Sequence, residues 1–149
     1  MNQFRLDIVL TNYGSLKQRL PPLLANQAQN FFVDSFKKQA WRDAATEPWQ
    51  NVKRRIEGTY EYKYPAKKGL SRRTKPILVM TGALRRAVGS SIREQRFERV
   101  KLVVALPYAD AQNYGTKKIA QRQFMGDSIT LRRLQTEMIN KEIQKVWQA

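Results

Sequence analysis

The segment that decides the fold lies between Ile77 and Gly126 and holds three short motifs. They read ILVMTGALR at residues 77–85, LPYADAQNYGT at residues 106–116 and RQFMG at residues 122–126. Each motif alternates apolar residues with Gly or Pro, which commonly end helices and strands. None of the three pairs a nucleophile with a base, so the segment indicates a structural or assembly role and not catalysis.

Length and composition predict a single domain over residues 1–149. Hydrophobic residues make up 42% of the chain and charged residues 27%, a balance typical of a protein with a packed core. The sequence contains no apolar run of membrane-spanning length, and Arg5 and Asp7 interrupt the first apolar residues. We therefore expect neither a membrane span nor a secretory signal, and a chain that stays in the cytosol.

The absence of two residue types narrows the possible chemistry. The chain has no Cys and no His, which removes disulfides, thiolate catalysis and the commonest general base and metal ligand. Carboxylates, Lys and Tyr would have to supply any catalysis. The acids of the first half are scattered without the spacing of a metal site or an acid–base pair: Asp7, Asp34, Asp43, Glu47, Glu57 and Glu61.

The positive charge is large and unevenly distributed. The chain holds 28 Lys and Arg against 12 Asp and Glu, a formal net charge of +16. No acid occurs between Glu61 and Glu94, while that stretch holds Lys63, Lys67, Lys68, Arg72, Arg73, Lys75, Arg85, Arg86 and Arg93. Such a field attracts an acidic protein surface or a polyanion such as DNA, or it is a solvated face with no specific partner.

The first half of the chain predicts a strand, a helix and a long loop. Alternating apolar residues from Gln3 to Leu10 favour a strand that residues 12–14 should end. Prolines 21 and 22 are expected to begin or to kink a helix that runs to about Trp41. Its apolar stripe consists of Leu24, Ala28, Phe31, Phe32, Phe36 and Ala40. After Pro48, Trp49 should pin the next segment to the core, and residues 60–76 should form an exposed basic loop.

The second half predicts short elements and a terminal helix. Thr81 should cap a helix over residues 82–88 that Gly89 closes. Strands are expected over residues 92–97 and 100–106 with a tight turn at 98–99, followed by a helix over 108–114 that Gly115 stops. Residues 123–125 should return to the sheet edge, and Ser128 should cap a helix whose apolar face runs from Leu131 to Val146. The predicted fold class is α+β, an antiparallel sheet packed against a long N-terminal helix and a C-terminal helix.

Taken in order, the motifs resemble those of a known family. A Trp follows a Pro at 48–49, an apolar strand runs into a Thr-Gly-x-Leu turn at 78–84, and a Tyr-Ala pair begins a short helix ending in Gly at 108–115. An Arg-x-Phe-hydrophobic-Gly segment then precedes the C-terminal helix. Over most of its length the chain resembles the phage virion morphogenesis or tail completion proteins, the group that includes the Mu-like G protein. It departs from them at 112–113, where members often carry His, and at 120–121, where they often carry Pro.

The resemblance implies a structural protein of a tailed phage or prophage. Such a protein acts at the neck or tail end, in tail completion or head–tail joining, as a ring of identical subunits. It is made in the bacterial host cytoplasm and ends in the virion. Its partners would be itself and other neck, connector or tail proteins, with packaged DNA in the channel as a further contact. We expect no enzyme activity, cofactor, metal, small-molecule substrate or membrane.

Ten residues are predicted to contact a partner, whether protein or DNA. They are Tyr60, Tyr62, Tyr64, Lys67, Lys68, Arg72, Arg73, Lys75, Arg85 and Arg86. The alternating tyrosines share one face if the segment is extended, and that face fits either a plain edge strand or a contact surface. The turns at 81–82 and 108–115 are expected to hold the fold, and Trp41, Trp49 and Trp147 to pack in the core or against helices.

Two other functions remain open at this point. The same charge would suit a basic nucleic-acid-binding module, whose affinity for DNA falls steeply as salt rises. A hydrolase that uses a carboxylate is a third possibility, and the scattered acids make it the weakest of the three.

Overall fold

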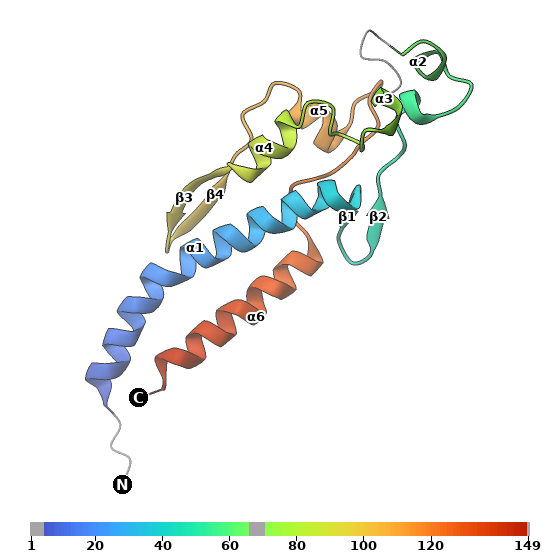
Figure 1. Ribbon diagram of the computed structural model, residues 1–149. Helices are drawn as coiled ribbons and strands as arrows, with labels where there is room; N and C mark the ends of the chain where they lie inside the picture. Colours follow the sequence, from blue (N-terminus) through green and yellow to red (C-terminus); the bar gives the residue numbers. More distant parts are fainter. Residues whose placement is uncertain (1–4, 66–70, 149) are drawn as a thin grey trace.

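Two long antiparallel helices form the body of the molecule, and the other elements lie beside them and at one end (Figure 1). The computed structural model describes residues 5–65 and 71–148. The helices are α1 (Leu6–Lys38), α2 (Tyr60–Lys63), α3 (Ser71–Thr74), α4 (Ala83–Gly89), α5 (Ala109–Tyr114) and α6 (Ile129–Val146), with a 3-10 turn, η1 (Lys53–Arg55). The strands are β1 (Ala40–Arg42), β2 (Thr46–Pro48), β3 (Ile92–Arg96) and β4 (Arg99–Leu102). The predicted α+β class is confirmed.

Helix α1 begins far earlier than the sequence predicts. The expected strand over residues 3–10 is wrong for its described part, because the chain is helical from Leu6 onward. Val9, Leu16 and Leu20 are buried at helical spacing and form a cluster with Val146 of α6. The expected break at 12–14 is absent, and α1 runs on for 33 residues. Packing against α6 therefore decides the conformation of a segment whose local pattern favoured a strand.

The tandem prolines lie inside α1 and do not begin it. Pro21 and Pro22 lack the backbone N–H groups that would complete the hydrogen bonds of the preceding turns, and a proline costs roughly 3 kcal/mol in a helix interior. The helix continues through them because Leu20 and Ala25, on either side, are buried. It ends at Gln39, which takes the left-handed conformation with φ 49° and donates its N–H to the Ser35 carbonyl.

Four residues of the predicted apolar stripe, Ala28 and three Phe, lie in the main core, but the helix ends at Lys38 and not near Trp41, so Ala40 lies on β1, and Leu24 packs against the second cluster. Phe31, Phe32 and Phe36 are buried on α1. The Phe36 ring lies 5.5 Å from Trp49 and 5.4 Å from Phe124, measured between centroids. Trp49 is buried, so the prediction that it pins the chain after Pro48 is confirmed. Aromatic contacts of this kind join the end of α1 to segments far along the sequence.

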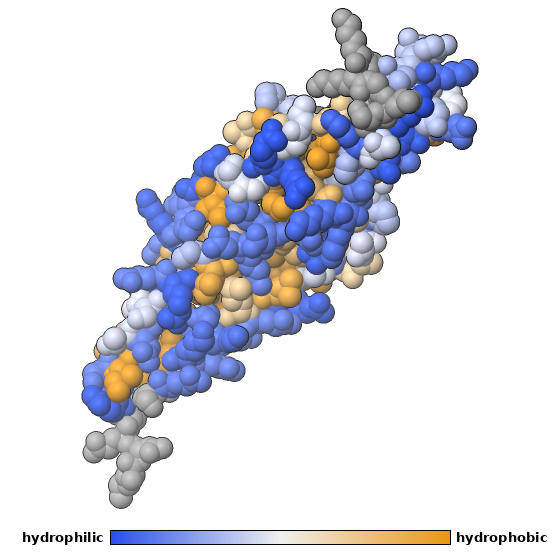
Figure 2. Space-filling view, in the orientation of Figure 1, coloured by the Kyte–Doolittle hydropathy of each residue, from blue (hydrophilic) through white to orange (hydrophobic). Residues whose placement is uncertain are grey.

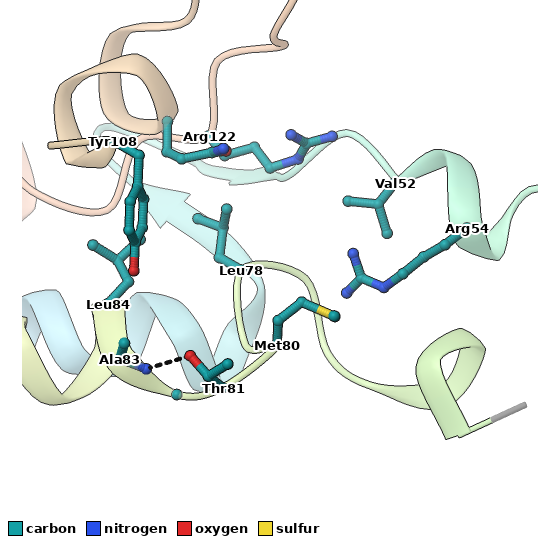
Figure 3. A pocket seen from close by; sticks show the side chains of 11 residues that line it. Val52, Arg54, Leu78, Met80, Thr81, Ala83, Leu84, Tyr108 and Arg122 are labelled. Atoms are coloured by element: carbon teal, nitrogen blue, oxygen red, sulfur yellow. Dashed lines mark hydrogen bonds between the residues drawn. The ribbon is translucent and has the colours of Figure 1, made fainter. Parts of the chain in front are cut away.

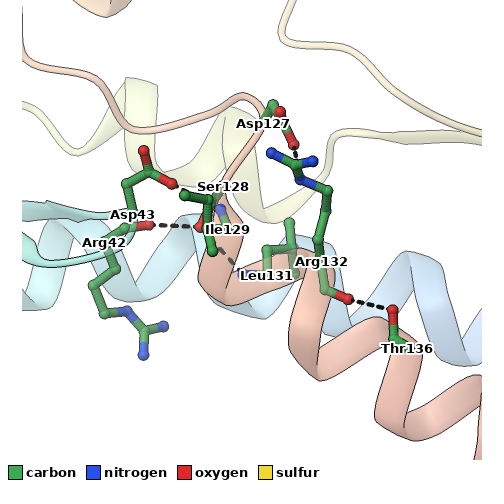
Figure 4. A network of polar contacts seen from close by, with 8 residues as sticks. All are labelled: Arg42, Asp43, Asp127, Ser128, Ile129, Leu131, Arg132 and Thr136. Atoms are coloured by element: carbon green, nitrogen blue, oxygen red, sulfur yellow. Dashed lines mark hydrogen bonds and ion pairs between the residues drawn. The ribbon is translucent and has the colours of Figure 1, made fainter.

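Helix α6 begins at a double cap (Figure 4). The Ser128 hydroxyl accepts a hydrogen bond from the Leu131 N–H at 3.1 Å, which confirms the predicted cap. The Asp43 carboxylate, from the β1–β2 turn, accepts a second from the Ile129 N–H at 2.7 Å. From this point α6 runs back along α1. The expectation that Trp147 packs is wrong, because α6 ends one residue before it and its side chain is 63% exposed.

Two separate hairpins replace the one sheet that the sequence predicts. β1 pairs with β2, and β3 pairs with β4, each antiparallel. Arg96 lies opposite Arg99, so the β3–β4 turn falls at 97–98, next to the predicted position, and β4 ends at Leu102 and not at residue 106. Residues 123–125 do not join a sheet edge, because Asn113 takes their backbone hydrogen bonds. The strand expected at 78–80 is also absent.

The short helices begin and end close to their predicted positions. Gly82, with φ 75°, is the residue before α4, and the Thr81 hydroxyl accepts the Ala83 N–H at 3.3 Å. Gly89 does not close the helix in a left-handed conformation, because it is the last helical residue. Gly115, with φ 75°, stops α5 as predicted. Among the described helices, none has the length and apolar character needed to cross a membrane.

A buried carboxylate ties the distal turns of α1 and α6 together. The Glu142 side chain is 7% exposed and accepts hydrogen bonds from Arg19 Nε at 2.8 Å and from Lys145 Nζ at 2.5 Å. The bond from Lys145, joined by that from Arg19, lowers the pKa of Glu142 and outweighs the opposing effect of burial. A carboxyl whose pKa is lower in the folded chain stabilises the fold at neutral pH, and this contribution is lost as pH falls through the folded pKa.

We expect Glu142→Gln to lower the free energy of unfolding at neutral pH by roughly 1–2 kcal/mol, because a charged acceptor of two hydrogen bonds is lost. As pH falls below about 4.5, the free energy of unfolding should also decrease less in the variant than in the wild type. Urea unfolding followed by circular dichroism at several pH values measures both effects. Glu137→Gln, at an exposed position of the same helix, is the matched control. Equal pH profiles for Glu142→Gln and wild type would contradict this role.

Candidate functional site

Helices α2 and α3, which carry some of the predicted contact residues, lie at the end of the molecule opposite to the first turn of α1, whereas α4, which carries Arg85 and Arg86, lies alongside α1 (Figure 1). We define the basic lobe as the described residues 53–65 and 71–86, which include η1, α2, α3 and the start of α4. It carries nine Lys or Arg residues and two Glu residues. Hydrophilic side chains cover most of this end in Figure 2.

The three tyrosines do not share one face. The alternation suggested an extended segment, but residues 60–63 form the single-turn helix α2, whose cap is the Thr59 hydroxyl accepting the Tyr62 N–H at 3.3 Å. On a helix, positions four apart are neighbours, so the rings of Tyr60 and Tyr64 are in contact, with centroids 4.9 Å apart and planes inclined at 43°. They are 72% and 63% exposed, while Tyr62 points elsewhere and is half-buried.

Several basic side chains of the lobe hydrogen-bond to its own backbone carbonyls. The Arg73 guanidinium lies 4.1 Å from the Tyr62 ring centroid and donates to the Tyr62 carbonyl. Lys75 Nζ donates to the Met80 carbonyl at 3.0 Å. Arg54 donates to the Pro76 carbonyl, also at 3.0 Å. These bonds hold the irregular chain in place, and a carbonyl does not neutralise the cation that it accepts from.

The remaining predicted contacts divide into two groups. Arg85 is exposed on α4, and Arg86 is exposed but donates to the Thr81 carbonyl at 3.0 Å, folded over Gly82. Lys67 and Lys68 lie outside the described residues, as does the side chain of Arg72. The structure therefore places Tyr60, Tyr64, Arg73 and Lys75 on or next to α2 and α3, and Arg85 and Arg86 on α4, which packs against α1.

Ion pairs among the described residues gather on the body of the molecule. Their carboxylates are Asp7, Asp34, Glu94, Asp127 and Glu142, which lie on or beside α1, β3 and α6. In the lobe, the cations of Arg73, Lys75 and Arg86 are held by carbonyls instead. The body is thus closer to internal charge balance, whereas the lobe keeps a net positive field that an external anionic surface would neutralise.

A pocket of about 240 Å³ opens where the lobe meets the body (Figure 3). Leu78, Met80, Leu84 and Tyr108 give it a largely apolar wall, with Arg54 at its edge. The described lining contains no carboxylate, which removes the usual acid or base in a chain without His. The described residues also hold no cluster of acids able to bind a metal.

A clamp of three side chains fixes the segment that carries the RQFMG motif. The Arg122 guanidinium, almost fully buried, donates to the carbonyls of Gln50 at 2.8 Å and Asn51 at 3.1 Å. Burial lowers the pKa of Arg122, which nonetheless remains a cation at neutral pH. Trp49 Nε1 donates to the Gln123 carbonyl at 2.7 Å. The motif therefore holds the fold.

Asn113 completes this clamp and is the residue that the sequence analysis missed. Its side-chain oxygen accepts the N–H groups of Phe124 at 2.9 Å and Met125 at 3.0 Å, and its amide donates to the Met125 carbonyl at 2.9 Å. The Asn amide has one oxygen and one NH₂ group, so a single residue can replace a strand partner for this segment. The only signal in the sequence was a polar residue near the end of a predicted short helix.

We expect Asn113→Ala to destabilise the chain by roughly 2–4 kcal/mol, because it leaves buried backbone groups of two residues without partners. Thermal and urea unfolding measure the loss, and Asn26→Ala, at an exposed position of α1, should change stability by less than about 0.5 kcal/mol. A variant at position 113 as stable as the wild type would show that water or another side chain replaces the clamp.

Three comparisons bear on the family of this chain. Models of known protein families, curated proteins and solved structures were all searched, and none of them matches it.

Proposed function

We propose that the chain is a structural virion assembly protein of a tailed phage or prophage. It would act at the neck or tail end, in tail completion or head–tail joining, as a homo-oligomeric ring. The order of its sequence motifs supports this proposal. The structure is compatible with it, because most residues of those motifs hold the fold and leave a separate surface for contacts.

One observation carries the proposal: the described residues of the basic lobe hold nine Lys or Arg against two Glu, and its Arg73, Lys75 and Arg86 donate to backbone carbonyls, which do not neutralise them. A surface that contributed only to stability would gain by pairing its cations with carboxylates, as the body does. Rigid aromatic and Arg side chains are the residues most enriched at the centre of protein interfaces, and the lobe exposes Tyr60, Tyr64 and Arg85. The partner of this surface would be acidic.

Like charge also determines how copies of the chain would associate. Two lobes facing each other would repel, so neighbouring subunits of a ring would meet through other surfaces or through one lobe and one different patch. The lobes would then face a common partner. In a virion this partner would be an acidic surface of a neighbouring neck, connector or tail protein, with packaged DNA as a further contact.

Deletion of the reading frame from the phage or prophage that encodes it tests the proposal. Electron microscopy of the lysate should show filled heads and tails that are not joined, with infectious titre reduced by several orders of magnitude. A plasmid copy should restore the titre. Normal virions from the deletion strain would contradict the proposed function.

A variant of the lobe tests which surface is used. Tyr64→Ser combined with Arg85→Glu should lower complementation of the deletion at least about tenfold, because the change removes one aromatic anchor and reverses one charge. Lys141→Glu, at an exposed site of α6, is the control for charge reversal. Circular dichroism should show that both variants fold. Full complementation by the lobe variant would show that the lobe is not part of the contact surface.

The same uncompensated charge favours one other function, binding of nucleic acid. Filter binding of duplex DNA at about 50 mM and 200 mM salt separates the two, because phosphate-dominated binding falls by orders of magnitude over that range. Tight, salt-sensitive binding by the monomer would favour the nucleic-acid module. Weak binding at both salt concentrations is the result that the assembly function predicts.

A further inference from the structure

The pocket between the lobe and the body has a buried cation in its lining (Figure 3). Arg122 is 8% exposed, and its Nε and Nη2 donate to the carbonyls of residues 50 and 51. Its Nη1 makes no hydrogen bond to a described residue, and no described carboxylate pairs with it. A guanidinium held only by carbonyls keeps its charge, so it would attract an anion that entered the pocket.

A second polar group of the same lining also lacks a partner. Gln112 lies next to Arg122, because the Arg122 N–H donates to the Gln112 carbonyl at 2.8 Å. The side-chain oxygen of Gln112 is buried and receives no hydrogen bond from the described residues. If the amide turns about its last torsion, it presents its NH₂ group in place of this oxygen. Arg122 and Gln112 can then donate together to one carboxylate.

Other cations surround this part of the pocket. Lys75 donates to the Met80 carbonyl and Arg86 to the Thr81 carbonyl, both at 3.0 Å, and Met80 and Thr81 belong to the lining. Arg54 also belongs to the lining, and Figure 3 shows its guanidinium directed toward Met80. The field in the pocket is therefore positive, and it favours an anionic ligand over a neutral or cationic one.

The rest of the pocket is apolar and small. Its volume of about 240 Å³ lies below the roughly 300–1,000 Å³ of most small-molecule sites, so it has room for about one large side chain. Leu78, in its wall, takes the left-handed conformation with φ 60°, which is uncommon for any residue other than glycine. Backbone strain of this kind is often found where a protein holds a ligand.

These features specify a ligand with one carboxylate and one large apolar group, both within the size of a single residue. The last residue of a protein chain supplies both, because its Cα carries the carboxylate and the side chain. An apolar residue inside a chain would depend on a neighbouring Asp or Glu for the carboxylate, which needs room for a second side chain. A free amino acid would bring an ammonium group among the cations.

We infer that this pocket binds the C-terminal residue of a partner protein, a large apolar residue with a free carboxylate. Capture of a chain-end carboxylate is one of the recurring modes of peptide recognition. The inference rests on the proposed function only for which virion protein supplies the chain end. Peptide binding is measured on the purified chain, so its failure would leave the assembly function standing. A failed deletion experiment would likewise leave the pocket standing.

Titration of the ¹⁵N-labelled chain with short peptides, followed by NMR, tests the inference. An acetylated tetrapeptide, Ser-Gly-Ser-Leu with a free carboxylate, should shift the signals of residues 78–84 and of Arg122 Nε–H in a saturable way. The same peptide with a C-terminal amide should bind at least about tenfold more weakly, because it loses charge-assisted hydrogen bonds. Replacing its Leu by Ser should also cost at least about tenfold, because the apolar contact is lost.

A pair of variants tests where the peptide binds. Met80→Glu places a carboxylate among the cations, and Met80→Gln makes a change of similar shape without the charge. The Glu variant should bind the free-acid peptide at least about tenfold more weakly than the Gln variant. Lys141→Glu, at an exposed site of α6, should bind it as the wild type does. Circular dichroism confirms that each variant folds.

Four results would overturn the inference. The first is no binding of the free-acid peptide at about 5 mM, and the second is equal binding of the free acid and the amide. The third is tighter binding of an acetylated, amidated Ser-Leu-Glu-Ser peptide, which would identify an internal acidic segment as the occupant. The fourth is tighter binding of octanoate, which would identify a free apolar acid.

Discussion

The structure depends on the packing of one helix surface, the aromatic residues near the end of α1, against segments distant in sequence. Phe36 contacts both Trp49 and Phe124, and Phe31 lies at 90° to Trp41, so the core joins the first third of the chain to its last third. Neither two-stranded hairpin would be stable alone. Each is held because it lies against α1, which contacts β1, β3, β4, α4 and α6.

This body sets the conditions under which the lobe can act. Arg122 fixes the chain before the lobe by hydrogen bonds to the carbonyls of residues 50 and 51, and the buried side chains of Leu84 and Val88 hold α4, at the other end of the lobe, against α1. The lobe therefore starts from anchored ends although its own helices are single turns. A surface that is held in place before it meets a partner loses less conformational entropy on binding. The proposed assembly function depends on this combination of a well-packed body and a separate, charged lobe.

Local signals in the sequence predicted the elements whose ends depend on a single residue. Ser128 caps α6 and Gly115 stops α5 because a hydroxyl and a left-handed glycine do the same thing in most surroundings. The aromatic stripe of α1 followed from helical spacing in the same way, whereas the fold class followed from the predicted elements together with the family resemblance. The contact residues were predicted from charge and from the alternating tyrosines, and they stay a prediction; the described ones lie on or next to α2 and α3 and on α4.

The errors arose where tertiary contacts override local preference. Nothing near Pro21 reveals that α6 will cover the preceding turns, so the early start of α1 was missed. The alternation of Tyr60, Tyr62 and Tyr64 fits a strand, but Thr59 caps a helical turn there and Arg73 covers Tyr62. The role of Asn113 depends on residues 124 and 125, which reach it only in the folded chain.

The central claim is that this chain is a building block whose basic lobe docks on an acidic neighbour within a particle. Immunogold labelling of purified phage particles, with antibody raised against the purified chain, examines this most directly. The account predicts label at one position, the neck or the tail end, in nearly every particle. Particles that lack the chain would contradict this account. Recovery of the chain only outside the particles, bound to nucleic acid, would contradict it as well.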